Sequence, residues 1–434
     1  MKKMSKTVSC LVIVILSLTM CVQSTTAFAE NMPEDVPTYS REDDLLGISP
    51  NIPDISFVPS YMARSEEEAP ALYEETPVTL FRAENLSPQT VTDLDYTDWW
   101  YSPWEDCHYL FLPATADRSS LTITYETDNG SALYLNGTAV TSGNMTSLLS
   151  ETDEFQVTVG STDCGTLKIM QSNLGCIYLS TSHGGLDALD MDGRIVETGS
   201  ILILNAEGGT EYSGEMEHLK SHGNSSWDYS QKKPYNLKLP KKTDLYGMGK
   251  AKKWALLGNY LDHSMFRNAV TFEMSRAAGM DTVMDYVFVD LYADGSYRGT
   301  YQLTERVQIQ KNRVNIRDLE EETEKLNDRA LDEYTQIVSG AEHPWDYIEN
   351  SYKYYDIPNN PADITGGYLL QFQLWNRYGG KVQSGFITSR GQTIDISEPE
   401  YASEAQVTYI RNFVQELEDA IYSETGYNAK GKHY

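Results

Sequence analysis

Lysine side chains gather in one short stretch of an otherwise strongly acidic chain. The 434-residue sequence carries a formal net charge of −29. A nucleoside triphosphate carries several negative charges, and its site needs cations held at fixed distances. The stretch is therefore a candidate for phosphate binding, although taken alone a basic cluster is more often a solvated face. Its lysines are Lys232, Lys233, Lys238, Lys241, Lys242, Lys250, Lys252 and Lys253.

Lys233 and Lys238 flank a short run, 235–239, whose apolar residues alternate as in a strand. Successive side chains of a strand point to opposite faces. Because the two lysines are an odd number of positions apart, both can face one side only across a bulge. Otherwise one of them points to solvent.

Asp262 precedes a helical pattern and is predicted to be its N-cap, with catalytic base as the alternative role. Arg267 falls in the first turns of that helix, where backbone N–H groups attract phosphate. Alternatively, Arg267 and Asn268 tie the helix to a sheet. Glu305 ends a predicted strand and is placed to hold one of the lysines by an ion pair.

Composition and missing motifs exclude several function classes. The net charge argues against nucleic acid and anionic membrane as partners, since both would be repelled, and it permits a basic protein substrate. The hydrolase motifs G-x-S-x-G and H-E-x-x-H are absent.

No cysteine has zinc-site spacing, so no metal site is predicted. Of Cys107, Cys164 and Cys176, the last two are the favoured disulfide pair.

The N-terminus has the pattern of a secretory signal peptide over residues 1–29. Lysines at positions 2, 3 and 6 precede an apolar run, 11–22, and the sequence Ala27-Phe28-Ala29. We therefore expect a secreted protein of the extracellular space or cell envelope, typical of a Gram-positive bacterium, with no membrane span after cleavage. Residues 30–79 are rich in Pro, Glu, Asp and Ser and are predicted to be a disordered acidic linker.

Residues 80–174 are predicted to form an antiparallel β-sandwich that folds by itself. Leu121, Ile123 and Tyr125 alternate on one face of a strand. Asn129-Gly130 and Asn136-Gly137 supply hairpin turns. The aromatic cluster Trp99, Trp100, Tyr101 and Trp104 could contact cell wall or carbohydrate, and core or edge packing is the alternative.

Residues 175–434 mix strands and helices, so the chain is assigned to the α+β class. A β-hairpin is predicted over 287–303, turning at Asp294-Gly295. The helix after Asp262 carries apolar residues at 266, 270 and 274 and closes near Gly279. A second amphipathic helix carries Val407, Ile410, Val414, Leu417 and Ile421.

Four segments, in order, resemble the CotH family, the spore-coat H type of secreted atypical protein kinase. H-G-N-S-S-W at 222–227 and K-K-P-Y-N-L-K-L at 232–239 are similar to the family's R-G-N-S-T-W and K-K-P-Y-x-[IL]-K. The second segment, 245–268, ends D-x-S-x-x-R-N, and the third is Y-R-G-T-Y-Q-L-T-E at 297–305. The fourth is G-G-Y-L-L at 366–370 with Glu398-Pro399. The resemblance covers about 215–400.

The resemblance implies a kinase-like α+β domain over 175–434 that uses ATP and Mg²⁺. It implies transfer of phosphate to Ser or Thr of an exported protein, Ser-rich or basic. His222 stands where the family usually has Arg, so a phosphate contact there would be weaker and pH-dependent. The residues it assigns to the nucleotide are Lys233, Lys238, Lys253, Arg267, Asn268 and Glu305.

The family's N-x-D and W-D-[FY]-D segments, which supply its catalytic base and metal ligands, have no match in this sequence. We therefore expect a piece of a longer protein that carries the nucleotide-cradling half of the domain. The catalytic residues would lie beyond Tyr434, with Asp262 as the fallback candidate. The alternative is a non-catalytic cell-surface or spore-coat scaffold or adhesin with the same fold.

The signal-peptide assignment predicts that the secreted protein begins at Glu30, because Ala27-Phe28-Ala29 has the small residues that signal peptidase requires. N-terminal sequencing of secreted material is expected to read Glu-Asn-Met-Pro. Material that still begins at Met1 would contradict the assignment.

Overall fold

The computed structural model describes residues 76–87, 93–128, 130–223, 225–339, 351–373, 378 and 381–433. The predicted signal peptide and nearly all of the predicted linker lie outside these residues. The described chain divides into two compact units. The barrel unit contains the residues up to Val270 and Met284–Arg306, and the C-terminal unit contains Thr271–Val283 and the residues from Val307 onward.

The barrel unit begins with two sheets that share one hydrophobic core. Leu121 and Ile123 are fully buried there and Tyr125 packs partly, so the predicted alternation along this strand is confirmed. The first sheet has the order β2 (Tyr96–Asp98), β1 (Val78–Glu84), β5 (Leu121–Thr127), β8 (Asn144–Thr146). The second has the order β3 (Trp100–Ser102), β4 (Cys107–Leu112), β10 (Thr162–Gln171), β9 (Glu154–Val159), β6 (Leu133–Leu135), β7 (Thr138–Ala139).

Two features of this sandwich differ from the sequence prediction. Strand β10 pairs with β4 in parallel, so the second sheet is mixed and not purely antiparallel. Strands β5 and β6 lie in different sheets, so the chain at Asn129-Gly130 crosses between sheets and forms no hairpin; Asn129 itself lies outside the described residues. Asn136-Gly137 does join β6 to β7, with the positive φ angles of a tight hairpin turn.

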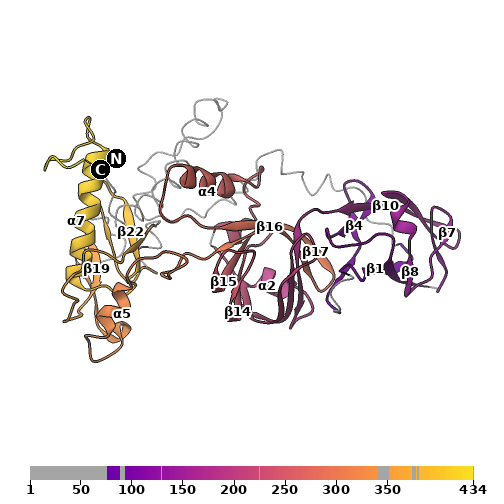
Figure 1. Cartoon of the computed structure of the whole chain (residues 1–434), viewed down its shortest axis with the longest axis horizontal. Coiled ribbons are helices and arrows are strands. Elements are labelled where there is room, and N and C mark those ends of the chain that lie inside the picture. Colours follow the sequence, from indigo (N-terminus) through magenta and orange to yellow (C-terminus); the bar gives the residue numbers. More distant parts are fainter. Residues whose placement is uncertain are drawn as a thin grey trace, which may run out of the picture. The chain divides into compact units, whose positions relative to one another are not determined.

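Seven strands then close into a barrel whose ends meet through the parallel pair β11 and β16 (Figure 1). Its interior is filled by large side chains, among them Trp254, Tyr235 and Tyr301. The strands follow the order β11 (Gly175–Thr181), β12 (Glu197–Leu204), β13 (Thr210–Ser221), β14 (Tyr235–Asp244), β15 (Lys250–Leu257), β17 (Ser296–Glu305), β16 (Tyr286–Ala293). Short helices α2 (Asp187–Met191) and α3 (Ser225–Asp228) connect them.

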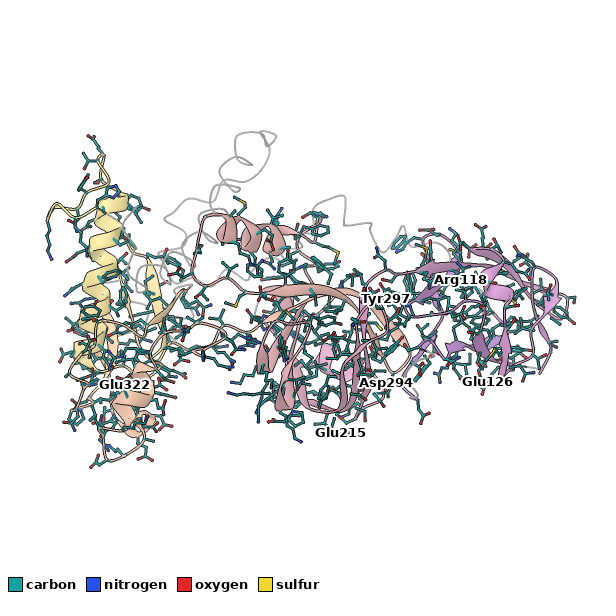
Figure 2. All side chains as sticks on the ribbon, viewed as in Figure 1. Arg118, Glu126, Glu215, Asp294, Tyr297 and Glu322 are labelled. Atoms are coloured by element: carbon teal, nitrogen blue, oxygen red, sulfur yellow. The ribbon has the colours of Figure 1, made fainter. Side chains whose placement is uncertain are left out.

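The sandwich and the barrel are packed against each other through a continuous core. Tyr292 of the barrel belongs to the same buried cluster as the sandwich strands, and its hydroxyl donates to the Phe111 carbonyl at 3.3 Å. The Phe111 ring stacks on Tyr297 with centroids 4.4 Å apart. Figure 2 shows Tyr297 and Asp294 where the sandwich and barrel strands meet. Burial of these rings therefore stabilises both parts together.

The predicted hairpin and helix ahead of it form, with one shifted boundary. Strands β16 and β17 are antiparallel and turn at Asp294-Gly295, both with positive φ. Helix α4 spans Arg267–Ala277 and ends before Gly279, whose φ of +78° suits a helix C-terminus. It begins at Arg267, several residues later than the prediction, because the chain after Asp262 first makes a turn.

The C-terminal unit places a long helix on a small sheet. Helix α7 (Glu404–Ile421) begins with a capping box between Ser403 and Gln406. Its predicted apolar face is confirmed at Val407, Ile410, Val414 and Leu417, which are buried, whereas Ile421 is exposed. The sheet order is β18 (Gln336–Ser339), β19 (Tyr352–Tyr355), β21 (Gly385–Ile387), β22 (Thr393–Glu398), β20 (Leu369–Phe372), and α5 (Leu319–Glu324) precedes it.

The overall class is α+β, as the sequence predicted. Within the described ranges, no helix has both the length and the apolar character needed to cross a bilayer. The favoured disulfide between Cys164 and Cys176 is wrong for this structure, because both residues are free thiols on β10 and β11. Burial raises the pKa of the Cys176 thiol to about 12, which keeps it protonated and unreactive.

The shared core predicts that sandwich and barrel unfold together. Tyr292→Ala removes a fully buried ring and is expected to lower the free energy of unfolding by about 3 kcal/mol. Amides of β5 and of β14 should both exchange roughly a hundredfold faster in hydrogen–deuterium exchange. Tyr427→Ala, at a half-exposed position, is the control and should leave both unchanged. Acceleration confined to β14 would show that the sandwich is an independent unit.

Candidate functional site

Three of the four motif segments lie on neighbouring barrel strands. Strands β13, β14 and β15 are adjacent, and β17 follows β15. The register places His218 of β13 opposite Lys238 of β14, and Lys238 opposite Lys253 of β15. Paired residues on adjacent strands share a face of the sheet, so these three side chains form one row. Burial and the nearby lysines lower the pKa of His218, so the two lysines supply the charge of this row.

Alternation along β14 decides which residues face outward. Tyr235, Leu237 and Leu239 are buried in the barrel, so Asn236 and Lys238 point away from its interior. Electrostatic contacts connect the outward residues of β13, β14 and β15 to one another. We call this group the basic face: His218, Lys220, His222, Lys238, Lys253 and Arg306.

Lys238 is held in place by a carboxylate that the sequence did not single out. Its Nζ lies 2.5 Å from Glu217 Oε1, and this hydrogen bond lowers the pKa of Glu217. Glu305, the predicted partner of a lysine, is buried and accepts a hydrogen bond from the Asp285 amide at 2.9 Å. The register puts Glu305 opposite Trp254, next to Lys253 in the chain. Lys253 itself is exposed.

At the end of the basic face, His222 and Arg306 share the side chain of Asn236. His222 Nδ1 lies 2.9 Å from Asn236 Oδ1, which also accepts from Arg306. Because Oδ1 is an acceptor, Nδ1 carries the proton and Nε2 remains for another partner. Burial lowers the pKa of both cations, and Arg306 lowers that of His222 further. A bound anion would favour the protonated histidine.

Lys233 does not lie on the basic face. Its Nζ donates to the Trp227 carbonyl at 2.6 Å and lies over the Trp227 ring, on a side of the strand where α2 packs. There the Tyr235 hydroxyl donates to Asp190 Oδ1 at 2.6 Å, and Arg298 pairs with the same carboxylate. The structure therefore brings Lys238 and Lys253 together and separates Lys233 from them.

Lys232, which was not singled out from its neighbours, is the most unusual lysine of the stretch. Its Nζ donates to the Thr300 carbonyl and lies 4.6 Å from the centre of the Tyr301 ring. Two motif glycines make room for it: a Cβ at Gly258 would lie 2.5 Å from the Lys232 carbonyl, and one at Gly299 3.3 Å from its side chain. Burial lowers the pKa of Lys232 to about 8.

Asp262 and Asn268 organise the start of α4. Asp262 accepts from the amides of Ser264 and Arg267, at 3.0 and 2.7 Å. Although partial burial alone would raise its pKa, these hydrogen bonds bring the pKa below the ordinary value. Because α4 begins at Arg267, Asp262 lies too early to be its N-cap as predicted, and its carboxylate instead holds the turn before the helix. An ionised carboxylate with occupied lone pairs is also poorly suited to act as a general base.

Asn268 joins this helix to the barrel. Its amide donates to Asn259 Oδ1 at 3.0 Å, and Asn259 donates in turn to the Gln302 side chain of β17 at 2.9 Å. The Arg267 side chain is largely exposed and pairs with Asp262 at 3.4 Å. The alternative prediction was that Arg267 and Asn268 tie the helix to the sheet. Asn268 does so, whereas the Arg267 side chain remains accessible to an anion.

The fourth motif segment lies in the C-terminal unit. Strands β20 and β22 pair so that Leu369 lies opposite Glu398, which brings the two parts of this segment side by side. Gly367 has a φ of +91°, and a Cβ there would lie 2.8 Å from the Arg317 carbonyl. The glycine is therefore required by the local backbone.

The lysines and the arginine of the basic face are side chains of the kind that hold phosphate oxygens. Among the residues that the structure describes, no cluster of three or more His, Cys, Asp or Glu side chains could hold a metal ion. Mg²⁺ prefers carboxylate and water oxygens.

Comparison with protein families agrees with the motifs. Residues 219–434 match the family model described as CotH kinase protein. The match begins on β13 and includes all four motif segments and every residue of the basic face except His218. No curated protein matches the chain.

The buried position of Lys232 predicts a pH dependence of stability. Its pKa is about 8 in the folded state against an ordinary 10.5, so the unfolded chain binds more protons between these values. The free energy of unfolding contributed by this group therefore rises with pH from about 8 to 10.5. Lys232→Met should remove that rise in denaturant titrations across this range. Lys325→Met, at an exposed lysine paired with Glu321, should retain it, and an unchanged slope in Lys232→Met would contradict the assignment.

Proposed function

Because residues 219–434 of this chain belong to the CotH kinase protein family, we propose that the basic face binds the phosphates of ATP. The chain then acts as the nucleotide-cradling part of a secreted CotH-type kinase. Such a kinase transfers the γ-phosphate of ATP to Ser or Thr of an exported protein, Ser-rich or basic.

The observation that carries this proposal is the pair of lysines on adjacent strands. Lys238 and Lys253 are aligned by hydrogen-bond register, with His218 beside Lys238, in a chain whose net charge is −29. Like charges held side by side cost free energy in the absence of a counter-ion. Glu217 offsets only part of that cost, and a polyphosphate would offset the remainder.

The residues of the basic face suit different parts of a polyphosphate. Lys238 and Lys253 carry point charges on flexible stems that start from neighbouring strands, and Glu217 holds Lys238 in position before the nucleotide arrives. Arg306 presents a planar fork that can take two phosphate oxygens. His222 adds charge only when it is protonated, as expected where the family usually has arginine.

The second candidate function is a non-catalytic scaffold or adhesin of the cell surface or spore coat. It uses the same barrel without nucleotide. The two functions differ in a direct measurement, because the scaffold has no need of the cations and should not bind ATP at all.

Single substitutions on the basic face test the proposal by ATP titration in a calorimeter, with and without Mg²⁺. Lys253→Ala should weaken ATP binding roughly 10- to 100-fold, since a hydrogen bond to a charged group contributes about 1.5 to 3 kcal/mol. Lys238→Ala should weaken binding more, because it leaves the Glu217 carboxylate facing the phosphates. Glu217→Gln removes that carboxylate charge and should tighten binding.

Lys325→Ala is the matched control, because Lys325 is also paired with a glutamate but lies at the C-cap of α5, away from the basic face in the chain. It should bind ATP as the unaltered chain does. Binding should also strengthen as pH falls below 6.5, where His222 gains its proton, and His222→Ala should flatten that dependence. No measurable ATP binding, or equal binding by all variants, would favour the scaffold.

A further inference from the structure

An exposed aromatic surface lies on the outer face of the sandwich, apart from the basic face. The register pairs Trp100 of β3 with Tyr109 of β4, and Tyr109 with Lys168 of β10. These three residues therefore form a row on one face of the mixed sheet. Phe111, two residues along β4, continues the same face, and its ring plane lies within 15° of Tyr109.

Large aromatic side chains on this surface remain in water. Trp100 and Trp104 are each 49% exposed. By contrast, Trp99 is packed between Phe81 and His108, with ring centroids 4.9 and 3.8 Å away. The four-residue aromatic cluster of the sequence thus divides: Trp99 packs in the core and Trp100 and Trp104 face solvent. Two indoles that stay exposed at one edge of a sheet do not contribute the free energy that their burial would provide. Exposed aromatic side chains of this kind are typical of a binding surface.

Fixed polar groups border these rings. Glu105, in the turn after β3, accepts from the Tyr109 hydroxyl at 2.5 Å and from Lys168 Nζ at 3.0 Å. Both hydrogen bonds end on Oε2, so Oε1 has no partner among the described residues. Tyr101 donates to Asp106 at 2.8 Å in the same turn. Hydrogen-bonding groups are therefore held in position beside an apolar platform.

The charges decide which ligand fits this surface. Lys168 is neutralised by Glu105, and Asp106 adds a negative charge, so nucleic acid would be repelled although its bases also stack on aromatic rings. A sugar ring has an apolar C–H face that can stack on an indole, and hydroxyls that donate to carboxylates. An uncharged polymer avoids the repulsion.

We propose that Trp100, Trp104, Tyr109 and Glu105 form a binding surface for neutral polysaccharide. Pyranose rings stack on the exposed indoles, and Glu105 Oε1 accepts hydroxyl protons. Lys168 and the Tyr109 hydroxyl hold the carboxylate in position. The surface serves to attach the protein to a glycan, which is a role separate from nucleotide binding.

Sedimentation of the full chain with insoluble polysaccharide tests this surface. Cellulose and chitin represent neutral glycans. Purified peptidoglycan, whose peptides carry carboxylates, is the charged comparison, and retention on peptidoglycan alone would contradict a neutral ligand. The double variant Trp100→Ala/Trp104→Ala is expected to reduce the bound fraction at least tenfold on whichever polysaccharide retains the unaltered chain. Glu105→Gln should weaken binding several-fold, because it removes the charge of the acceptor.

Tyr229→Ala is the control, since Tyr229 is an aromatic residue of the barrel that is even more exposed than the two tryptophans, at 66% against 49%. It should sediment with polysaccharide as the unaltered chain does. Thermal unfolding of the double variant should match the parent, which excludes misfolding as the cause of lost binding. Retention by none of the three polysaccharides, equal retention of the double variant, or retention on single-stranded RNA instead would overturn the proposal.

Discussion

Closure of the seven-stranded barrel is the constraint on which the other features depend. A barrel of this size has an interior just wide enough for side chains, so Trp254, Tyr235 and Tyr301 must point inward and fill it. Once Tyr235 and Leu237 are inside, the pleat forces Asn236 and Lys238 outside. The basic face is thus a consequence of core packing together with the register of the strands.

Glycines of the motif segments serve this packing more than they serve chemistry. Gly258 and Gly299 make room for the backbone and side chain of Lys232, which would otherwise meet a Cβ. The lysine then fills space beside Tyr301 and satisfies the Thr300 carbonyl. Desolvation of this half-buried amine costs free energy and lowers the pKa of Lys232.

Aromatic stacking connects the sandwich with the barrel. A series of rings with centroids 4.4 to 6.2 Å apart runs from the exposed Trp100 to the buried Tyr178, crossing between the two parts at Phe111 and Tyr297. Offset and tilted rings of this kind contribute beyond their buried area. The same side chains that expose an aromatic surface at one end therefore anchor the sandwich at the other.

The sequence by itself determined the local elements and the family. Period-two alternation predicted β5 and the hairpin at Asp294-Gly295, three-and-four spacing predicted α7, and the motif segments predicted the CotH family. These signals are local, since turn chemistry and amphipathic periodicity act within a few residues. Lys238 and Lys253 were likewise visible as lysines of the motif segments.

Only the tertiary structure decided which distant residues meet. The parallel pairing of β4 with β10, the closure of β11 on β16, and the partnership of Lys238 with Glu217 join positions far apart in the chain. Several strands of similar alternation could pair in more than one order, and burial of the complete core selects among them. For the same reason, the sequence could not show that Lys233 and Lys238 have different partners. The contacts that distinguish them, with the Trp227 carbonyl and with Glu217, form only when the barrel closes.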